Sequence, residues 1–175
     1  MELAASQSIQ FQILVEVALA AFLSACIGLE RELADKPAGL RTHVLVGGAA
    51  ALLVGLSDVA VNHFAIDLGT AVIRTDPIRI MEAVVTGVAF LGAGTIIRRD
   101  SENQVEGLTT AASILVATAI GISAALQQWI LAVGVTVLVL VTLRGLGLIE
   151  RRLVKKKRTH YQLSPDQKGN KNEGT

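Results

Sequence analysis

The sequence predicts an all-α integral membrane protein with five transmembrane helices, built from two parallel helical-hairpin repeats plus one peripheral helix. The first reason is composition: 51% of the 175 residues are hydrophobic and only 18% are charged, with a mean hydropathy of +0.54. The second reason is that the apolar residues form blocks of about 20 residues, the length that crosses a hydrocarbon core. The third is an internal repeat. A soluble domain of this size needs a more polar surface, so that class is excluded.

The apolar blocks define a transmembrane domain over residues 1–149. The predicted spans are about 9–29, 42–61, 78–97, 108–126 and 129–149. Residues 150–175 follow as a basic, polar cytoplasmic tail, and we expect the part after the basic cluster at 150–158 to be disordered. The first block lacks a basic start and an A-x-A-like end, so it is not interpreted as a cleaved signal peptide.

Small residues recur every fourth position in several spans, and this pattern lets helix backbones approach closely. The stripes are Ala20, Ser24 and Gly28; Gly47, Ala51 and Gly55; and Ser113, Ala117, Gly121 and Ala125. The fifth span is mostly branched and begins at Trp129, where an interfacial aromatic residue is expected. We therefore expect the first four spans to pack together and the fifth to face lipid.

Polar residues mark the connections between the spans. Residues 57–77 form the longest connection, which we expect to be a loop with a short interfacial helix. Asp76 suits the N-cap of the third span, because that position needs a side-chain acceptor, and Pro77 suits its first turn. Residues 98–107 are predicted to form a short charged loop, and Gln127 and Gln128 leave room only for a tight turn.

The basic residues predict the orientation of the chain in the membrane. They gather in the first connection, in the third connection and after residue 149, whereas the N-terminus and the turn at 127–128 carry none. With five spans, these basic groups fall on one side. The positive-inside rule then places the C-terminus in the cytoplasm and the N-terminus outside.

Two parts of the chain match each other without a gap at an offset of 68 residues. The identities include Ala21 with Ala89, Phe22 with Phe90, Arg31 with Arg99, Gly39 with Gly107 and Thr42 with Thr110. Both units are hairpins of the same orientation, so a duplication would relate them by an axis along the membrane normal. Chance matches between small apolar residues are the alternative.

Two carboxylates lie inside predicted spans, where an ionised side chain costs roughly 2.5–3.5 kcal/mol on insertion scales. At 1.5 Å per residue, Glu16 lies about 10 Å and Glu82 about 6 Å into repeat-equivalent helices. Facing one cleft, they would offer two carboxylates to a hard divalent cation such as Mg²⁺. Alternatively, Glu82 pairs with Arg79 on its own helix, and Glu16 faces an aqueous crevice.

The predicted cytoplasmic ends of the helices hold a second group of candidate residues. Its members are Glu30, Arg31, Glu32, Arg41, Thr42, His43, Arg98 and Arg99. The repeat places Glu30 opposite Arg98 as an opposite-charge pair, and ordinary interfacial salt bridges are the alternative. His43 is interpreted as a helix-start residue, because no second His or Cys lies at ligand spacing.

Other classes of function find little support. The basic cluster at 151–158 is expected to meet anionic lipid headgroups. Nucleic-acid binding is not indicated, because no aromatic platform or reading motif accompanies the cluster. The sequence contains no P-loop, nucleophile elbow or HExxH motif, so nothing in it argues for an enzyme. No cofactor is expected, apart from Mg²⁺ at the two carboxylates.

Five motifs, taken together and in this order, resemble the MgtC/SapB family of bacterial membrane proteins. They are IGLERE at 27–32, GLRTH at 39–43, DPIRI at 76–80, FLGAGTI at 90–96 and GLTTAA at 107–112. The resemblance implies an inner-membrane protein associated with adaptation to magnesium limitation. This chain departs from it by having only a short tail after residue 149, and by Glu82, where an uncharged polar residue is common.

Two hypotheses about function follow from the residues and the resemblance. In the first, the protein supports ion homeostasis by regulating membrane-protein partners, or through a homo-oligomer. In the second, it transports Mg²⁺ directly through Glu16 and Glu82. The inner halves of the spans offer only weak ligands such as Ser24 and Thr95, which favours the regulator. We expect the glycines Gly92, Gly94 and Gly107 to set the contact between the two repeats rather than to bind a ligand, while Gly107 and Thr110 are the repeat counterparts of Gly39 and Thr42.

Overall fold

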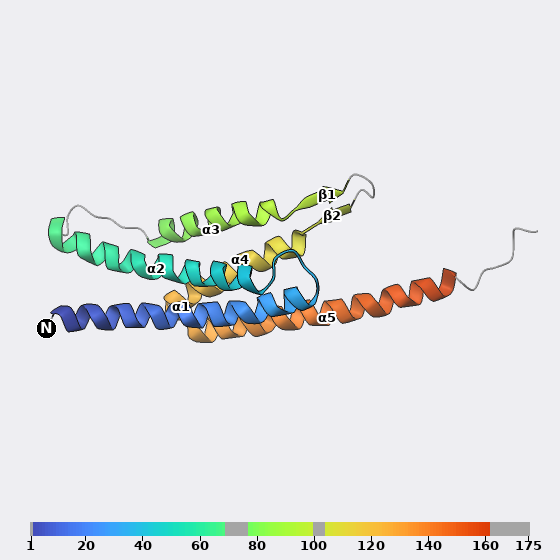
Figure 1. Cartoon of the computed structure of the whole chain (residues 1–175), viewed down its shortest axis with the longest axis horizontal. Coiled ribbons are helices and arrows are strands. Elements are labelled where there is room, and N and C mark those ends of the chain that lie inside the picture. The colour runs from blue at the N-terminus through green and yellow to red at the C-terminus, as the bar shows by residue number, and fades with distance from the viewer. Residues whose placement is uncertain (1, 69–76, 100–103, 162–175) are drawn as a thin grey trace, which may run out of the picture. The chain divides into compact units, whose positions relative to one another are not determined.

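The computed structural model describes residues 2–68, 77–99 and 104–161, with side chains described within 6–61, 78–97 and 105–145. In chain order the elements are α1 (Glu2–Leu33), α2 (Leu40–Leu68), α3 (Pro77–Gly94), β1 (Ile97–Arg99), β2 (Gln104–Glu106), α4 (Leu108–Ala125) and α5 (Trp129–Tyr161) (Figure 1). The chain divides into two compact units, Met1–Leu140 and Val141–Thr175. The second unit contains the C-terminal part of α5.

Helices α1, α2 and α4 pack against one another and form the core of the first unit. The predicted stripes meet there, in a buried cluster of Ala20, Ala51, Val54, Ala124 and Ala125. Gly121 of α4 lies so close to the Gly47 carbonyl of α2 that a methyl group at residue 121 would overlap it. The prediction that small residues pack these helices together is therefore confirmed for α1, α2 and α4.

Helix α3 contacts α4 and α2 but leaves much of its surface exposed. Gly92 packs against Ala111 of α4, within its own hairpin, whereas a Cβ at Gly94 would meet no atom within 4 Å. The expectation that both glycines join the two repeats is therefore wrong. Residues two apart on a helix point in different directions, so Gly92 and Gly94 cannot both face one neighbour.

Several helices are longer than the spans predicted from hydropathy. Helix α2 continues to Leu68 through part of the predicted loop, and α5 continues past the predicted end of its span at 149, through the basic cluster, to Tyr161. Conversely, α3 ends at Gly94, three residues before the predicted end of its span. Hydropathy marks what can lie in hydrocarbon but does not mark where a helix ends, and the Glu, Arg and Lys residues at 150–158 are good helix formers that extend α5 beyond its apolar part.

The predicted charged loop between α3 and α4 contains a short antiparallel hairpin. Strands β1 and β2 pair Ile97 with Glu106, Arg98 with Val105 and Arg99 with Gln104. The β-branched residues Ile97 and Val105 favour extended backbone, which explains why this segment is more than a loop.

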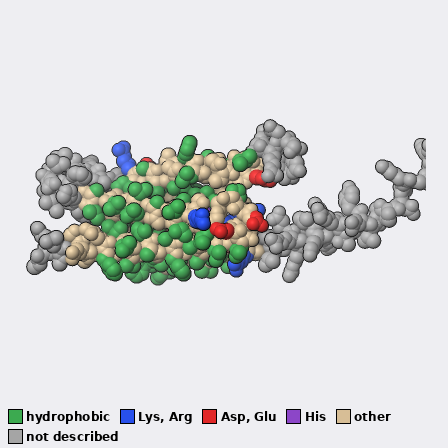
Figure 2. Space-filling view, viewed as in Figure 1, with side chains coloured by type: hydrophobic (Ala, Val, Ile, Leu, Met, Phe, Trp, Pro, Cys, Tyr) green, Lys and Arg blue, Asp and Glu red, His purple; other side chains and the backbone are tan. Residues whose placement is uncertain are grey.

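Three of the described helices are long and apolar enough to cross a membrane, by length and composition. These segments are Ser6–Leu33, Leu40–Val61 and Leu108–Ala125, and Trp129–Gly145 is a shorter apolar helix. Figure 2 shows a surface rich in hydrophobic side chains, with charged side chains gathered towards its ends. The described residues therefore indicate an all-helical membrane protein, while five spans and a repeat symmetry stay predictions.

The start of α5 is buried on one face only. Ala132 and Thr136 are buried within the first unit, whereas Ile130 is 93% exposed and Val137 is 55% exposed. In a membrane, such an exposed apolar face contacts lipid, in line with the peripheral position predicted for this helix.

Candidate functional site

A buried histidine lies where α1, α2 and α4 meet, near the start of α2. The His43 side chain is fully buried, with Nδ1 2.9 Å from the Gly39 carbonyl oxygen and Nε2 3.1 Å from Ser113 Oγ. A carbonyl oxygen only accepts, so the Nδ1–H group donates to Gly39. His43 thus joins the first turn of α2 to α4.

The Ser113 hydroxyl has a choice of partners that depends on the protonation of His43. Its Oγ lies 2.8 Å from the Thr110 carbonyl oxygen as well as 3.1 Å from His43 Nε2. With a neutral imidazole, the hydroxyl can donate its proton to Nε2. With an imidazolium, Nε2–H donates to Ser113, and the hydroxyl proton turns to Thr110. By rotating, the Ser113 hydroxyl can therefore satisfy His43 Nε2 in either protonation state.

Close backbone packing surrounds this histidine. A Cβ at Gly28 of α1 would lie 2.8 Å from Leu40 Cα and 2.9 Å from His43 Cβ. Any larger residue at position 28 would push α1 away from α2. The start of α2 is further held by Glu32, whose Oε2 accepts a 2.8 Å hydrogen bond from the Leu40 N–H and caps the helix.

The end of α1 buries a charged pair that is poorly satisfied. Arg31 is only 4% exposed, and its Nη1 lies 3.7 Å from Oε2 of the neighbouring Glu30. Arg31 Nε, Glu30 Oε2 and the fully buried Ser24 Oγ have no hydrogen-bond partner in the described part of the chain. Buried polar atoms are normally paired, so these three atoms mark the end of α1 as an unusual polar region.

A second polar cluster lies at the opposite end of α4. Glu16 of α1 is 4% exposed, and its Oε1 accepts hydrogen bonds from Gln12 Nε2 at 3.1 Å and Gln127 Nε2 at 3.3 Å. Gln127 belongs to the tight turn before α5 and has a left-handed φ of 58°. Among the described residues, Glu16 forms no ion pair. Its hydrogen-bond partners are two neutral carboxamides.

A tightly packed layer separates the two polar clusters, and its buried polar side chains are the hydroxyls of Ser24, which lies against Gly47, and Thr118. Ser113 and Gln127 are fourteen positions apart in the sequence, about 21 Å at the rise of an α-helix. Between them lie the contact of Gly121 with Gly47 and the buried alanine cluster around Ala124. The core of the first unit is therefore polar towards both ends and tightly packed in the middle.

The predicted pair of Glu16 and Glu82 has unequal surroundings. Glu82 and Arg79 are exposed on α3, whereas Glu16 is buried against the turn at Gln127. Within the described residues, no group of three or more His, Cys, Asp or Glu side chains could hold a metal ion. A shared Mg²⁺ site of Glu16 and Glu82 stays a prediction.

The remaining predicted site residues differ in position. Arg41 is exposed, Thr42 is half-buried and Thr110 is 2% exposed. Gly107 precedes α4 with φ +93°, where a Cβ would overlap the Thr95 carbonyl oxygen, so glycine is required there. Asp76 and the side chain of Arg98 lie outside the described residues, and so does the proposed pairing of Glu30 with Arg98.

Sequence reasoning missed the partners of the buried polar residues. His43 was correctly expected near a helix start, but Ser113 was interpreted as part of a small-residue stripe and as a weak ligand, and not as the partner of His43. Gln12 and Gln127 were not linked to Glu16. The sequence does contain one indication of such partners. Ser113 and Ser24 stand at stripe positions otherwise held by alanine and glycine, and a buried hydroxyl needs a hydrogen-bond partner.

These features define a class: a small all-helical membrane protein with polar clusters towards both ends of a packed core. The family model of the MgtC family matches residues 17–152. The chain belongs to the MgtC family.

Curated relatives agree with this assignment. The chain is 38% identical over 148 residues to a Haemophilus influenzae protein, covering 83% of this chain and 61% of that protein. It is 39% identical over 153 residues to the putative magnesium transporter YhiD of Escherichia coli (strain K12), covering 87% of this chain and 68% of YhiD. It is 33% identical over 132 residues to the protein MgtC of Salmonella typhimurium, covering 75% of this chain and 51% of MgtC. The match thus spans about half to two thirds of the length of these relatives. No solved structure matches the chain.

Proposed function

We propose that this chain supports adaptation to magnesium limitation and ion homeostasis in the bacterial cytoplasmic membrane by regulating membrane partners. Membership of the MgtC family and the similarity to YhiD, which is named a putative magnesium transporter, support the link to magnesium. The partners are other membrane proteins or a second copy of the chain, and the basic residues at 151–158 bind anionic lipid headgroups.

The packed layer between the two polar clusters is the observation that favours regulation over transport. An ion that crosses a membrane needs polar groups to replace its hydration shell. In the core formed by α1, α2 and α4, backbone contact between Gly121 and Gly47 and a cluster of buried alanines fill this layer, where the hydroxyls of Ser24 and Thr118 are the buried polar side chains. Transport through this core would require α2 and α4 to separate.

Reconstitution tests the proposal in two arms. The full chain is purified, inserted into liposomes that contain a Mg²⁺-sensitive dye, and exposed to external Mg²⁺. We expect the same Mg²⁺ uptake as in protein-free liposomes, and clear, saturable uptake would overturn the regulatory proposal.

A growth experiment is the second arm of the test. The chain is expressed in cells that lack it, and we expect better growth at low Mg²⁺. Unchanged growth would contradict the role in magnesium adaptation itself.

The alternative proposal is direct transport of Mg²⁺ as cargo, and the buried carboxylate of Glu16 is the observation that favours it. Glu16 has no counter-ion among the described residues, and a carboxylate with carboxamide neighbours can supply oxygen ligands to a hydrated Mg²⁺ ion. Under this alternative, changing both Glu16 and Glu82 to Gln abolishes the dependence of the protein's effect on Mg²⁺. An unchanged dependence in the double variant would remove the carboxylate site.

A further inference from the structure

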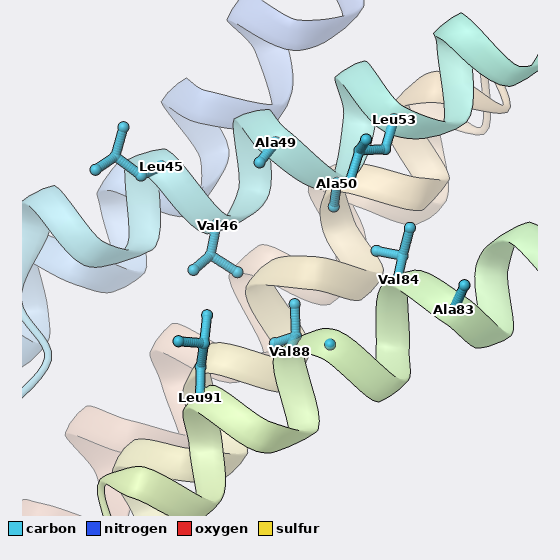
Figure 3. Close-up of a pocket in the computed structure, with 10 residues that line it drawn as sticks. Leu45, Val46, Ala49, Ala50, Leu53, Ala83, Val84, Val88 and Leu91 are labelled. Atoms are coloured by element: carbon cyan, nitrogen blue, oxygen red, sulfur yellow. The ribbon is translucent and has the colours of Figure 1, made fainter.

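An apolar groove of about 390 Å³ runs between α2 and α3. Its walls are made only of Ala, Gly, Val and Leu, with Val46 and Ala50 on α2 directed toward Val84 and Leu91 on α3 (Figure 3). Leu45 is 70% exposed, so the groove opens to the surface of the bundle.

The groove exists because small residues line it while α3 is held by α4. Gly92 packs on Ala111, and Val88 packs on the buried cluster that includes Val46 and Ile114, which fixes α3 in place. Gly87 faces the groove, and a Cβ there would meet no atom within 4 Å. Space is therefore left between the two helices where a larger side chain would fit.

One end of the groove carries an unpaired positive charge. Arg41 lies in the first turn of α2, four residues before Leu45, and residues four apart share one face of a helix. Its side chain is exposed and forms no hydrogen bond or ion pair with any side chain in the described part of the structure. A guanidinium group thus lies on α2 one helical turn before Leu45, which lines the groove.

We propose that this groove binds one anionic phospholipid, with an acyl chain between α2 and α3 and the phosphate on Arg41. The planar guanidinium donates two parallel hydrogen bonds to phosphate oxygens, a geometry that suits this group better than lysine. The walls offer no polar side chain, so they match a hydrocarbon chain. The site is separate from the basic cluster at 151–158 and does not depend on the proposed function.

Lipid retention by the purified full chain tests the proposal. The protein is placed in detergent with phosphatidylglycerol or phosphatidylcholine, and the bound lipid is counted by native mass spectrometry. We expect the unchanged protein to retain phosphatidylglycerol over phosphatidylcholine. Arg41→Gln should reduce phosphatidylglycerol binding by about tenfold, which corresponds to one charge-assisted contact, and leave phosphatidylcholine binding unchanged.

A variant that fills the groove distinguishes binding of an acyl chain in the groove from electrostatic attraction of the headgroup to Arg41 alone. Gly87→Leu should abolish retention of both lipids, since the new side chain occupies the groove without meeting the backbone of a neighbour. Gly94→Leu is the matched control, because that position is equally open but lies outside the groove. Retention by Gly87→Leu equal to that of the control would overturn the proposal. The proposal would also be overturned if the unchanged protein formed a dimer that Gly87→Leu dissociated and Gly94→Leu did not. The occupant of the groove would then be a second copy of the chain.

Discussion

At the scale of single residues, the core depends on polar side chains whose partners lie on other helices. His43 on α2 contacts Ser113 on α4, and Glu16 on α1 contacts Gln127 in the turn after α4. Both contacts lie within a largely apolar bundle. In such surroundings, an unsatisfied polar group costs more than its hydrogen bond contributes when it is made.

Ser113→Ala is expected to destabilise the protein by about 1–3 kcal/mol, because it leaves His43 Nε2 buried without a partner. The free energy of unfolding is measured by denaturant titration in detergent micelles. Ser123→Ala on the same helix is the control, since the Ser123 hydroxyl only donates to the Ala119 carbonyl of its own helix. Its effect should stay within about 0.5 kcal/mol. Equal effects of the two changes would show that the contact with His43 does not stabilise the fold.

Gly107→Ala tests the turn that starts α4. The left-handed backbone at φ +93° costs an L-residue about 1–2 kcal/mol, and the overlap with the Thr95 carbonyl adds to this cost. We expect lower thermal stability by circular dichroism. Gly94→Ala, in an open helical position, should instead stabilise the protein by roughly 0.5–1 kcal/mol. A neutral Gly107→Ala variant would contradict the strained turn.

At the scale of elements, two different kinds of contact hold the bundle together. Helices α1, α2 and α4 meet through backbone-close glycines and alanines, as in the contact of Gly121 with Gly47. Helix α3 is attached through fewer buried residues and leaves the groove on its α2 side. Without a hydrophobic driving force between helices in lipid, such close contacts supply the packing energy.

Gly121→Ala should therefore destabilise the contact between α2 and α4, although alanine is the better helix former. The added methyl group overlaps the Gly47 carbonyl, and overpacking typically costs about 1–3 kcal/mol. Gly134→Ala on α5 is the matched control, because a Cβ there meets no atom within 4 Å. The measurement that checks this prediction is the unfolding free energy of both variants. A stabilised Gly121→Ala variant would mean that α2 and α4 do not touch at this point.

At the scale of the whole molecule, hydropathy predicted where each apolar helix lies but not how far it extends. The fourth span was predicted at 108–126 and α4 is Leu108–Ala125, because a glycine in a left-handed turn and two glutamines delimit it. Helix α2 was expected to end near residue 61 but continues to Leu68, since leaving hydrocarbon does not end a helix.

The candidate site was less predictable than the fold for a physical reason. Spacing along the chain reveals which residues share a helix face, so the small-residue stripes were recognisable. It does not reveal which faces meet. His43 and Ser113 are 70 positions apart, close to the repeat offset but not equal to it, so neither periodicity nor the repeat pairs them. Their contact follows only from how α2 packs on α4.

The orientation of the whole molecule gives the last prediction. With five spans and the C-terminus in the cytoplasm, the turn at Gln128 faces outward and the loop at Lys36 faces inward. Cys26 is the one cysteine of the sequence, so single cysteines can be placed at these exposed positions in a Cys26→Ser background. A membrane-impermeant maleimide added to intact cells should label Gln128→Cys at once and Lys36→Cys only after the membrane is permeabilised. Gln128 is preferred to Gln127, which holds Glu16. The reverse labelling pattern would invert the orientation, and labelling of both sites in intact cells would exclude the three crossings by α2, α3 and α4 that this topology places between them.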